Sequence, residues 1–120
     1  MIDHLELFVR DIDASTEFYR RALAPLDYAL HVTHESRGFG TSPDHLDFWI
    51  RGGTVSSPTP HYAFNCASRE LVDRAHAAAV GAGGIDAGAP ALLPHIHASY
   101  YAALVRDLDG HKVEFVCHRG

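Results

Sequence analysis

Four residues whose side chains bind metals or transfer protons recur at matched places in the sequence. His4 and His61 each open an alternating apolar stretch, and Asp47 and Glu114 stand in the similar segments Leu-Asp-Phe-Trp and Val-Glu-Phe-Val. A carboxylate in the middle of a strand costs free energy unless water, a cation or a metal compensates its charge. Two imidazoles and two carboxylates suit a divalent transition metal that keeps positions open for water or substrate.

The first half of the chain has the pattern of a strand, a helix and three further strands. Residues 2–9 alternate, with His4 on the polar face. Asp13 is a suitable N-cap for a helix with one apolar side that ends near Pro25. Turn-forming residues then separate three short predicted strands, at residues 28–33, 38–41 and 46–50.

The same order begins again after a linker rich in Gly, Ser, Thr and Pro at about residues 53–59. Residues 61–66 alternate, and Ser68 can cap a helix that stops at Gly81. A long loop rich in Ala, Gly and Pro follows at residues 85–99. Two strands are then predicted at residues 100–106 and 113–117, joined by a hairpin turn at Asp109-Gly110.

Both halves therefore predict the order β-α-β-β-β, in one α+β domain with module one at about residues 1–52 and module two at about residues 60–120. If both helices cover one face of a curved sheet, the apolar residues of each alternating strand face the helices. The residues between them, which have the opposite parity in the strand, line a cleft. All four candidate residues have the cleft parity, and Asp47 and Glu114 are expected at equivalent positions.

These residues predict a metal site. His4, His61 and Glu114 would supply two imidazoles and one carboxylate on one side of the ion. Asp47 is the shorter carboxylate, so it either completes the site or hydrogen-bonds His45 or a loop amide.

Composition and charge limit the partners. The 120-residue chain carries a formal net charge of −5, and its ten Lys and Arg are scattered, which argues against nucleic acid binding. No apolar run is long enough to span a bilayer, so no membrane association is expected. The N-terminus enters a strand pattern without a secretory signal, which predicts a cytoplasmic protein. Cys66 and Cys117 are expected to be buried, and His111 and His118 are expected at the surface.

Several segments together resemble the vicinal oxygen chelate superfamily, which includes glyoxalases, bleomycin-resistance proteins and extradiol dioxygenases. In chain order they are M-I-D-H-L-E-L-F-V-R-D, H-L-D-F-W-I, H-Y-A-F-N, A-A-A-V-G-A-G-G-I-D-A-G-A-P and S-Y-Y-A-A-L-V-R-D-L-D-G-H-K-V-E-F-V-C-H. The resemblance covers nearly the whole chain. It implies two modules that form an open curved barrel with the helices outside, commonly completed in a homodimer.

For function, the resemblance implies a glyoxalase-like lyase or isomerase related to lactoylglutathione lyase. His4, Asp47, His61 and Glu114 would hold nickel, cobalt or zinc. The metal would polarise vicinal oxygens of a small substrate and stabilise an enediolate, with Glu114 as both ligand and base. The sequence shows no clear pattern of arginines for anchoring glutathione, and Asp47 stands where the family places Glu.

Two other functions of the superfamily remain open. A metal-free antibiotic-binding or resistance protein would use the cleft to sequester a small molecule, with Phe8 and Trp49 stacking against a flat ligand. An extradiol-type dioxygenase would hold iron and use His97 and Tyr101 as an acid/base pair. His95 and His97 lie in a predicted loop at the mouth of the cleft.

Overall fold

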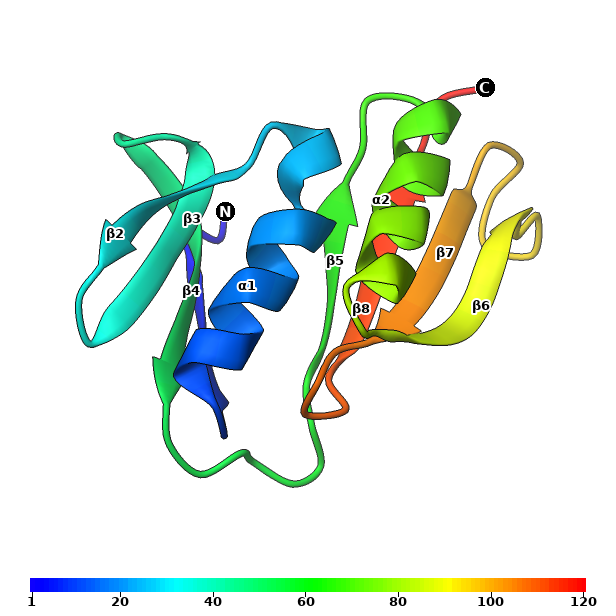
Figure 1. Cartoon of the computed structure of the whole chain (residues 1–120). Helices are drawn as coiled ribbons and strands as arrows, with labels where there is room; N and C mark the ends of the chain where they lie inside the picture. Colours follow the sequence, from blue (N-terminus) through cyan, green and yellow to red (C-terminus); the bar gives the residue numbers. More distant parts are fainter.

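The computed structural model describes residues 1–120, which form two modules of one helix and one four-stranded sheet each (Figure 1). The first module contains β1 (Leu5–Val9), α1 (Ile12–Ala22), the short 3-10 helix η1 (Ala24–Leu26), β2 (Ala29–Thr33), β3 (Ser36–Ser42) and β4 (His45–Gly52). The second contains β5 (His61–Asn65), α2 (Arg69–Gly81), β6 (Ile85–Leu92), β7 (Tyr101–Arg106) and β8 (Lys112–Cys117). The predicted α+β order is confirmed.

The two sheets have the same topology. Their strand orders are β1-β4-β3-β2 and β5-β8-β7-β6, so the first strand of each module pairs in parallel with the last. All other neighbouring strands are antiparallel. The helices lie side by side and contact each other, and the two sheets remain open (Figure 1). Neither helix is long and apolar enough to cross a membrane.

The ends of the helices follow from capping side chains. Helix α2 begins as predicted, because the Ser68 hydroxyl accepts a hydrogen bond from the Leu71 amide at 3.2 Å. Helix α1 begins two residues earlier than predicted. Its N-cap is Asp11, whose carboxylate accepts from the Ala14 amide at 3.0 Å, and Asp13 lies in the first turn, where the helix dipole favours an acid.

Replacing Ser68 with Ala is expected to lower the free energy of unfolding by about 1 kcal/mol, the usual effect of removing an N-cap. The Leu71 amide would lose its partner in the folded state. Urea denaturation followed by circular dichroism measures the change. Ser56→Ala, at an exposed linker position, is the matched control and should leave stability unchanged; equal stability of the two variants would contradict the role of the cap.

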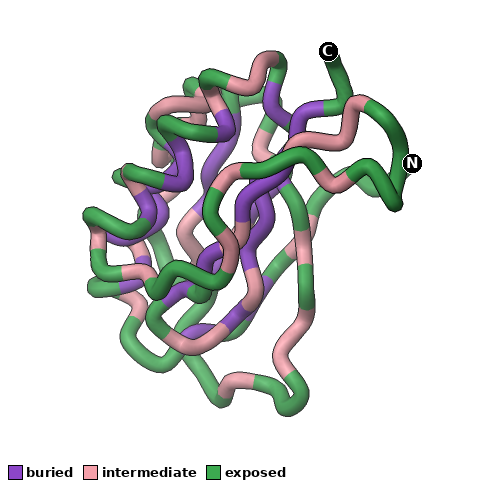
Figure 2. The backbone as a smooth tube through the Cα atoms, turned by 90° about the vertical axis from the view of Figure 1, so that its right-hand side faces the viewer, coloured by how far each residue is buried: buried purple, intermediate pink, exposed green.

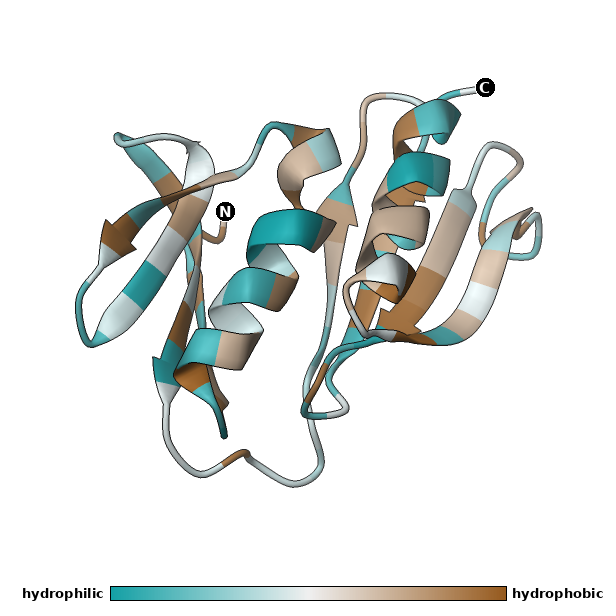
Figure 3. Cartoon of the chain, in the orientation of Figure 1, coloured by the Kyte–Doolittle hydropathy of each residue, from teal (hydrophilic) through white to brown (hydrophobic).

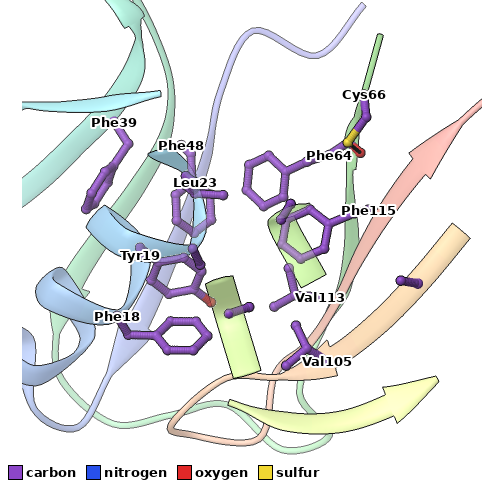
Figure 4. Packing of buried hydrophobic residues seen from close by; sticks show 14 of the residues in the cluster. Phe18, Tyr19, Leu23, Phe39, Phe48, Phe64, Cys66, Val105, Val113 and Phe115 are labelled. Carbon is purple, nitrogen blue, oxygen red and sulfur yellow. Dashed lines mark hydrogen bonds between the residues drawn. The ribbon is translucent and has the colours of Figure 1, made fainter. Parts of the chain in front are cut away.

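Aromatic side chains fill the junction between the modules. The buried Phe48 ring of β4 lies 4.7 Å from Tyr19, 5.7 Å from Tyr62 and 5.2 Å from Phe64, measured between ring centroids. Figure 4 shows Tyr19, Phe48 and Phe64 facing one another, and Figure 2 shows buried residues along the strands and the inner sides of the helices. Hydrophilic residues occupy the outer side of α1 (Figure 3). The modules therefore share one apolar core.

The prediction of a long loop before Tyr100 is wrong in part, because residues 85–92 form strand β6. This strand lies at the edge of the second sheet and pairs only with β7. Its Ala and Gly residues give no apolar alternation, and Pro90 is tolerated because an edge strand does not need every backbone donor. The loop proper is limited to residues 93–100.

A buried carboxylate at the β7–β8 turn links the two modules. One oxygen of Asp107 accepts hydrogen bonds from the Tyr19 hydroxyl and from His111 Nδ1, the latter at 2.8 Å. The other oxygen accepts from the backbone amides of Asp109 and His111 at 3.0 and 2.8 Å. Tyr62 donates to the Tyr19 oxygen. The expectation that His111 lies at the surface is wrong: its exposed fraction is 1%.

Candidate active site

A cleft of about 860 Å³ opens between the modules and contains three of the four predicted metal ligands. His4 and Asp47 line it from the first module, and His61 lines it from β5. Helix-facing residues such as Phe48 and Phe64 also line it. The cleft therefore lies at the seam between the modules and is lined by both parities, rather than only by the parity opposite the helices.

The structure brings His61 and Glu114 together. Ala63 pairs with Glu114 across the parallel β5–β8 ladder, and His61 lies two residues earlier on the same face. His61 Nε2 is 3.0 Å from Glu114 Oε1. The Glu114 side chain is only 9% exposed, and its bonding partners are this imidazole and the Tyr100 hydroxyl. Neither Lys nor Arg pairs with this carboxylate.

Tyr100, not Tyr101, is the tyrosine next to the carboxylate. The Tyr100 hydroxyl donates to Glu114 Oε2, and this hydrogen bond, with burial, raises the pKa of Tyr100 to about 12. Tyr100 therefore keeps its proton at neutral pH. Tyr101 points to the opposite face, where its hydroxyl donates to Asp73 at 2.6 Å and its ring packs under Arg69. The assignment of Tyr101 to an acid/base pair is thus contradicted by its position.

His97 lies beside Tyr100, as an edge contact of the rings 5.4 Å apart shows. The Ser99 amide donates to His97 Nδ1 at 3.1 Å, so that nitrogen is unprotonated and Nε2 carries the hydrogen. His97 Nε2 donates to His118 Nδ1 at 2.9 Å, and the two imidazoles stack. His97 is therefore held as a hydrogen-bond donor, and it has no direct contact with Glu114.

Sequence reasoning missed Tyr100 and His118. The alternation of β7 and β8 could have identified both residues. Tyr101 pairs with Cys117, so Tyr100 and His118 follow as the next residues at this end of the two strands, and both lie on the same face of the sheet as Glu114. Three imidazoles, one phenol and one carboxylate thus gather on this part of the second sheet: His61, His97, His118, Tyr100 and Glu114.

His4 and Asp47 lie in the cleft but have other partners. His4 Nδ1 is 2.6 Å from Asp3 Oδ1, and the His4 side chain is 58% exposed. Asp47 accepts a hydrogen bond from the Tyr28 hydroxyl at 2.7 Å, instead of bonding His45 or a loop amide. Burial, followed by this bond to Asp47, raises the pKa of Tyr28, so Tyr28 remains a donor.

The predicted equivalence of Asp47 and Glu114 is wrong by two residues. In the first sheet Glu6 pairs with Trp49, and in the second sheet Ala63 pairs with Glu114. Glu6 follows His4 by two residues, and Ala63 follows His61 by two residues. With these two histidines aligned, Glu114 corresponds to Trp49 and not to Asp47. The shift preserves parity, which is why both carboxylates still lie on the same side of their sheets.

Phe8 and Trp49, the predicted stacking residues, lie outside the cleft lining. The Trp49 ring covers Gly38, where an added Cβ would approach the ring to 2.9 Å, and its indole nitrogen donates to the Leu46 carbonyl at 3.1 Å. Phe8 is 47% exposed and covers Gly53. The aromatic residues that line the cleft are instead Tyr28, Phe48, Tyr62 and Phe64.

The one group of three metal-ligand side chains within 4.8 Å of one another is Asp107, Asp109 and His111. Its acceptors are already occupied: both Asp107 oxygens are hydrogen-bonded as described, and Asp109 accepts from the Arg10 amide and guanidinium. We therefore assign this group a structural role. The four predicted ligands form no such group, and only His61 and Glu114 are already adjacent.

Comparison with known proteins agrees with this fold. A sequence profile described as the Glyoxalase/Bleomycin resistance protein/Dioxygenase superfamily matches residues 1–115, and the chain belongs to this superfamily. A comparison with curated proteins finds no match.

Solved structures share the fold. A glyoxalase/bleomycin resistance protein from Albidiferax ferrireducens is 24% identical, with a TM-score of 0.81 and 96% of each chain covered. A glyoxalase/bleomycin resistance protein/dioxygenase family enzyme from Burkholderia phytofirmans is 18% identical, with a TM-score of 0.75 and 97% of each chain covered. A lactoylglutathione lyase from Agrobacterium tumefaciens is 16% identical, with a TM-score of 0.69, covering 98% of this chain and 92% of its own. At these identities the likeness establishes the fold alone.

Proposed function

We propose that the protein is a glyoxalase-like, metal-dependent lyase or isomerase that acts on a small substrate with two adjacent oxygens. The observation that supports this most is the contact between His61 Nε2 and Glu114 Oε1, at 3.0 Å, with His61 on the wall of the cleft. A largely buried carboxylate that has an imidazole neighbour and no Lys or Arg partner fits a cation. His61 and Glu114 would hold the metal, nickel, cobalt or zinc, and His4 is the proposed third ligand.

A bound divalent metal would supply Lewis-acid polarisation of the substrate oxygens. The chain itself supplies the proton transfers. Glu114 is the proposed base that takes a proton from the carbon next to a carbonyl, and Tyr100 is the proposed donor that holds a proton for the neighbouring oxygen. Asp47 keeps its bond to Tyr28, so it is not included among the ligands. A homodimer, in which a second copy covers the open sheets, is part of the proposal.

Metal analysis of the purified protein tests this assignment. We expect about one divalent ion per chain in the wild type and a loss of at least tenfold in affinity in His61→Ala and Glu114→Gln, because each removes a direct ligand. His34→Ala removes an exposed imidazole at the β2–β3 turn and is the matched control. Metal content that is substoichiometric and equal in all four proteins would overturn the metalloenzyme, and sedimentation of the same samples reports the oligomeric state.

A metal-free small-molecule binder is the second candidate, because His4 and Asp47 are already bonded to Asp3 and Tyr28. Absence of metal with retained ligand binding in the same preparations would favour it. Iron with oxygen consumption on catechols would support a dioxygenase. The Tyr101 hydroxyl donates to Asp73 on the helix-facing side, which gives no support to Tyr101 as the acid/base partner of His97 in this third function.

A further inference from the structure

The walls of the cleft carry negative charge without any basic side chain. Asp3, Asp27 and Asp47 are three of its eighteen lining residues, and none of the eighteen is Lys or Arg. Ion pairs elsewhere in the protein use Arg side chains, but none of them reaches these three carboxylates. The two lining imidazoles, His4 and His61, already contact Asp3 and Glu114. The cleft is therefore acidic.

All three carboxylates belong to exposed residues and have at least one free acceptor oxygen; in Asp3 only Oδ1 is bonded, to His4. Asp47 accepts one hydrogen bond, from Tyr28 to Oδ2, and Oδ1 has no donor in the structure. Asp27 has no side-chain hydrogen bond or ion pair, and it follows η1 in a left-handed conformation with φ 60°. Both residues belong to the first module and adjoin Tyr28, since Asp27 precedes it in the chain and Asp47 accepts its hydroxyl. This wall can accept hydrogen bonds from a ligand.

Four of the eighteen residues that line the cleft are aromatic: Tyr28, Phe48, Tyr62 and Phe64. Tyr28 packs edge-on against Phe64 with centroids 5.7 Å apart, and Phe48 packs against Tyr62 and Phe64. The face of an aromatic ring attracts a cation, most strongly where water is excluded. The phenols of Tyr28 and Tyr62 remain uncharged at neutral pH, because burial raises the pKa of each. The aromatic rings and the free carboxylates of the cleft thus both favour a positively charged ligand.

We propose that the cleft binds an organic cation, with a protonated amine or quaternary ammonium group at the Asp27–Asp47 wall and an apolar or aromatic body against the rings. An anionic ligand would meet three carboxylates and no Lys or Arg. The inference rests on the cleft of the proposed function and specifies its ligand class. The cationic group lies on module one, and the remainder of the ligand extends toward His61 of module two.

Binding of three phenyl compounds tests the charge preference. Phenyltrimethylammonium, its neutral isostere tert-butylbenzene and the anion benzoate would be titrated into isotopically labelled protein, with chemical shifts of Tyr28, Tyr62 and Phe64 as the readout. We expect the cation to bind at least tenfold more tightly than either other compound at low salt, and to weaken as salt is added. Equal affinity of all three compounds, or tighter binding of benzoate, would overturn the proposal.

Charge-removing variants locate the cation. Asp47→Asn and Asp27→Asn should each weaken phenyltrimethylammonium binding about threefold to fivefold, as expected for ion pairs of exposed residues. Asn tolerates the left-handed conformation at position 27, so the backbone should be retained. Asp44→Asn, in the β3–β4 turn outside the cleft lining, is the matched control. Unchanged affinity in both cleft variants would contradict the assignment.

The cation proposal and the metal proposal fail separately. Titrations of the chelator-treated protein measure cation binding without metal, and metal analysis of Asp27→Asn measures metal binding without that carboxylate. Loss of the cation preference with normal metal content overturns the ligand class alone. Retained cation preference in a protein that binds no metal supports the ligand class and overturns the metalloenzyme.

Discussion

Asp107→Ala is expected to lower the free energy of unfolding by about 3–5 kcal/mol, because it removes a buried acceptor of four hydrogen bonds. The side chains of Asp107 and His111 are each 1% exposed, so water cannot replace the lost partner. His111 Nδ1 and the backbone amides of Asp109 and His111 would lose their acceptor, and Tyr19 would have only the Tyr62 hydroxyl as a partner. Urea denaturation followed by circular dichroism provides the measurement.

Two further variants separate this explanation from a general effect of losing an acidic residue. Asp107→Asn keeps the shape and one oxygen, so it should destabilise by about 1–3 kcal/mol. Asp44→Ala removes an exposed acid and should change stability by less than about 0.5 kcal/mol. If Asp107→Ala were as stable as Asp44→Ala, the hydrogen bonds of Asp107 would not hold the two modules together.

Tyr100→Phe is expected to weaken metal binding about 10-fold to 100-fold, the range found when a hydrogen bond to a metal ligand is removed. The variant loses the hydroxyl that donates to Glu114 while keeping the ring that contacts His97 and His118. Competition with a chromophoric chelator measures the metal affinity.

Tyr101→Phe is the matched control, because the Tyr101 hydroxyl donates to Asp73 on the helix side of the sheet and not to Glu114. This variant should bind metal as the wild type does. If Tyr101→Phe weakened metal binding and Tyr100→Phe did not, the assignment of the two tyrosines would be reversed. Equal affinity of all three proteins would show that Tyr100 does not support the proposed ligand.

The repeated fold could be predicted because it depends on local patterns. Alternating strands, the Ser68 cap and the Asp109-Gly110 turn are each visible in a few consecutive residues, and φ of 89° at Gly110 agrees with the turn. Strand β6 was not predicted, because small residues and Pro90 at a sheet edge produce no alternation.

The site could be predicted only in part. Parity correctly placed His61 and Glu114 on one face, but parity cannot fix the register of two strands far apart in sequence, so Asp47 was aligned two residues away from its structural position. The choice between Tyr100 and Tyr101 depends on the conformation of the preceding loop. The link from Tyr19 to Asp107 joins residues 88 positions apart and has no local signature.

The position of Trp49 over Gly38 determines what intrinsic fluorescence can report. Trp49 is the only tryptophan, and it lies in the first sheet outside the cleft lining. Its emission should therefore follow the unfolding of the first sheet and remain nearly constant as ligand fills the cleft. The emission of the tyrosines in the cleft would instead change as ligand binds. Tryptophan and tyrosine fluorescence of the unlabelled protein would therefore report unfolding and ligand binding separately.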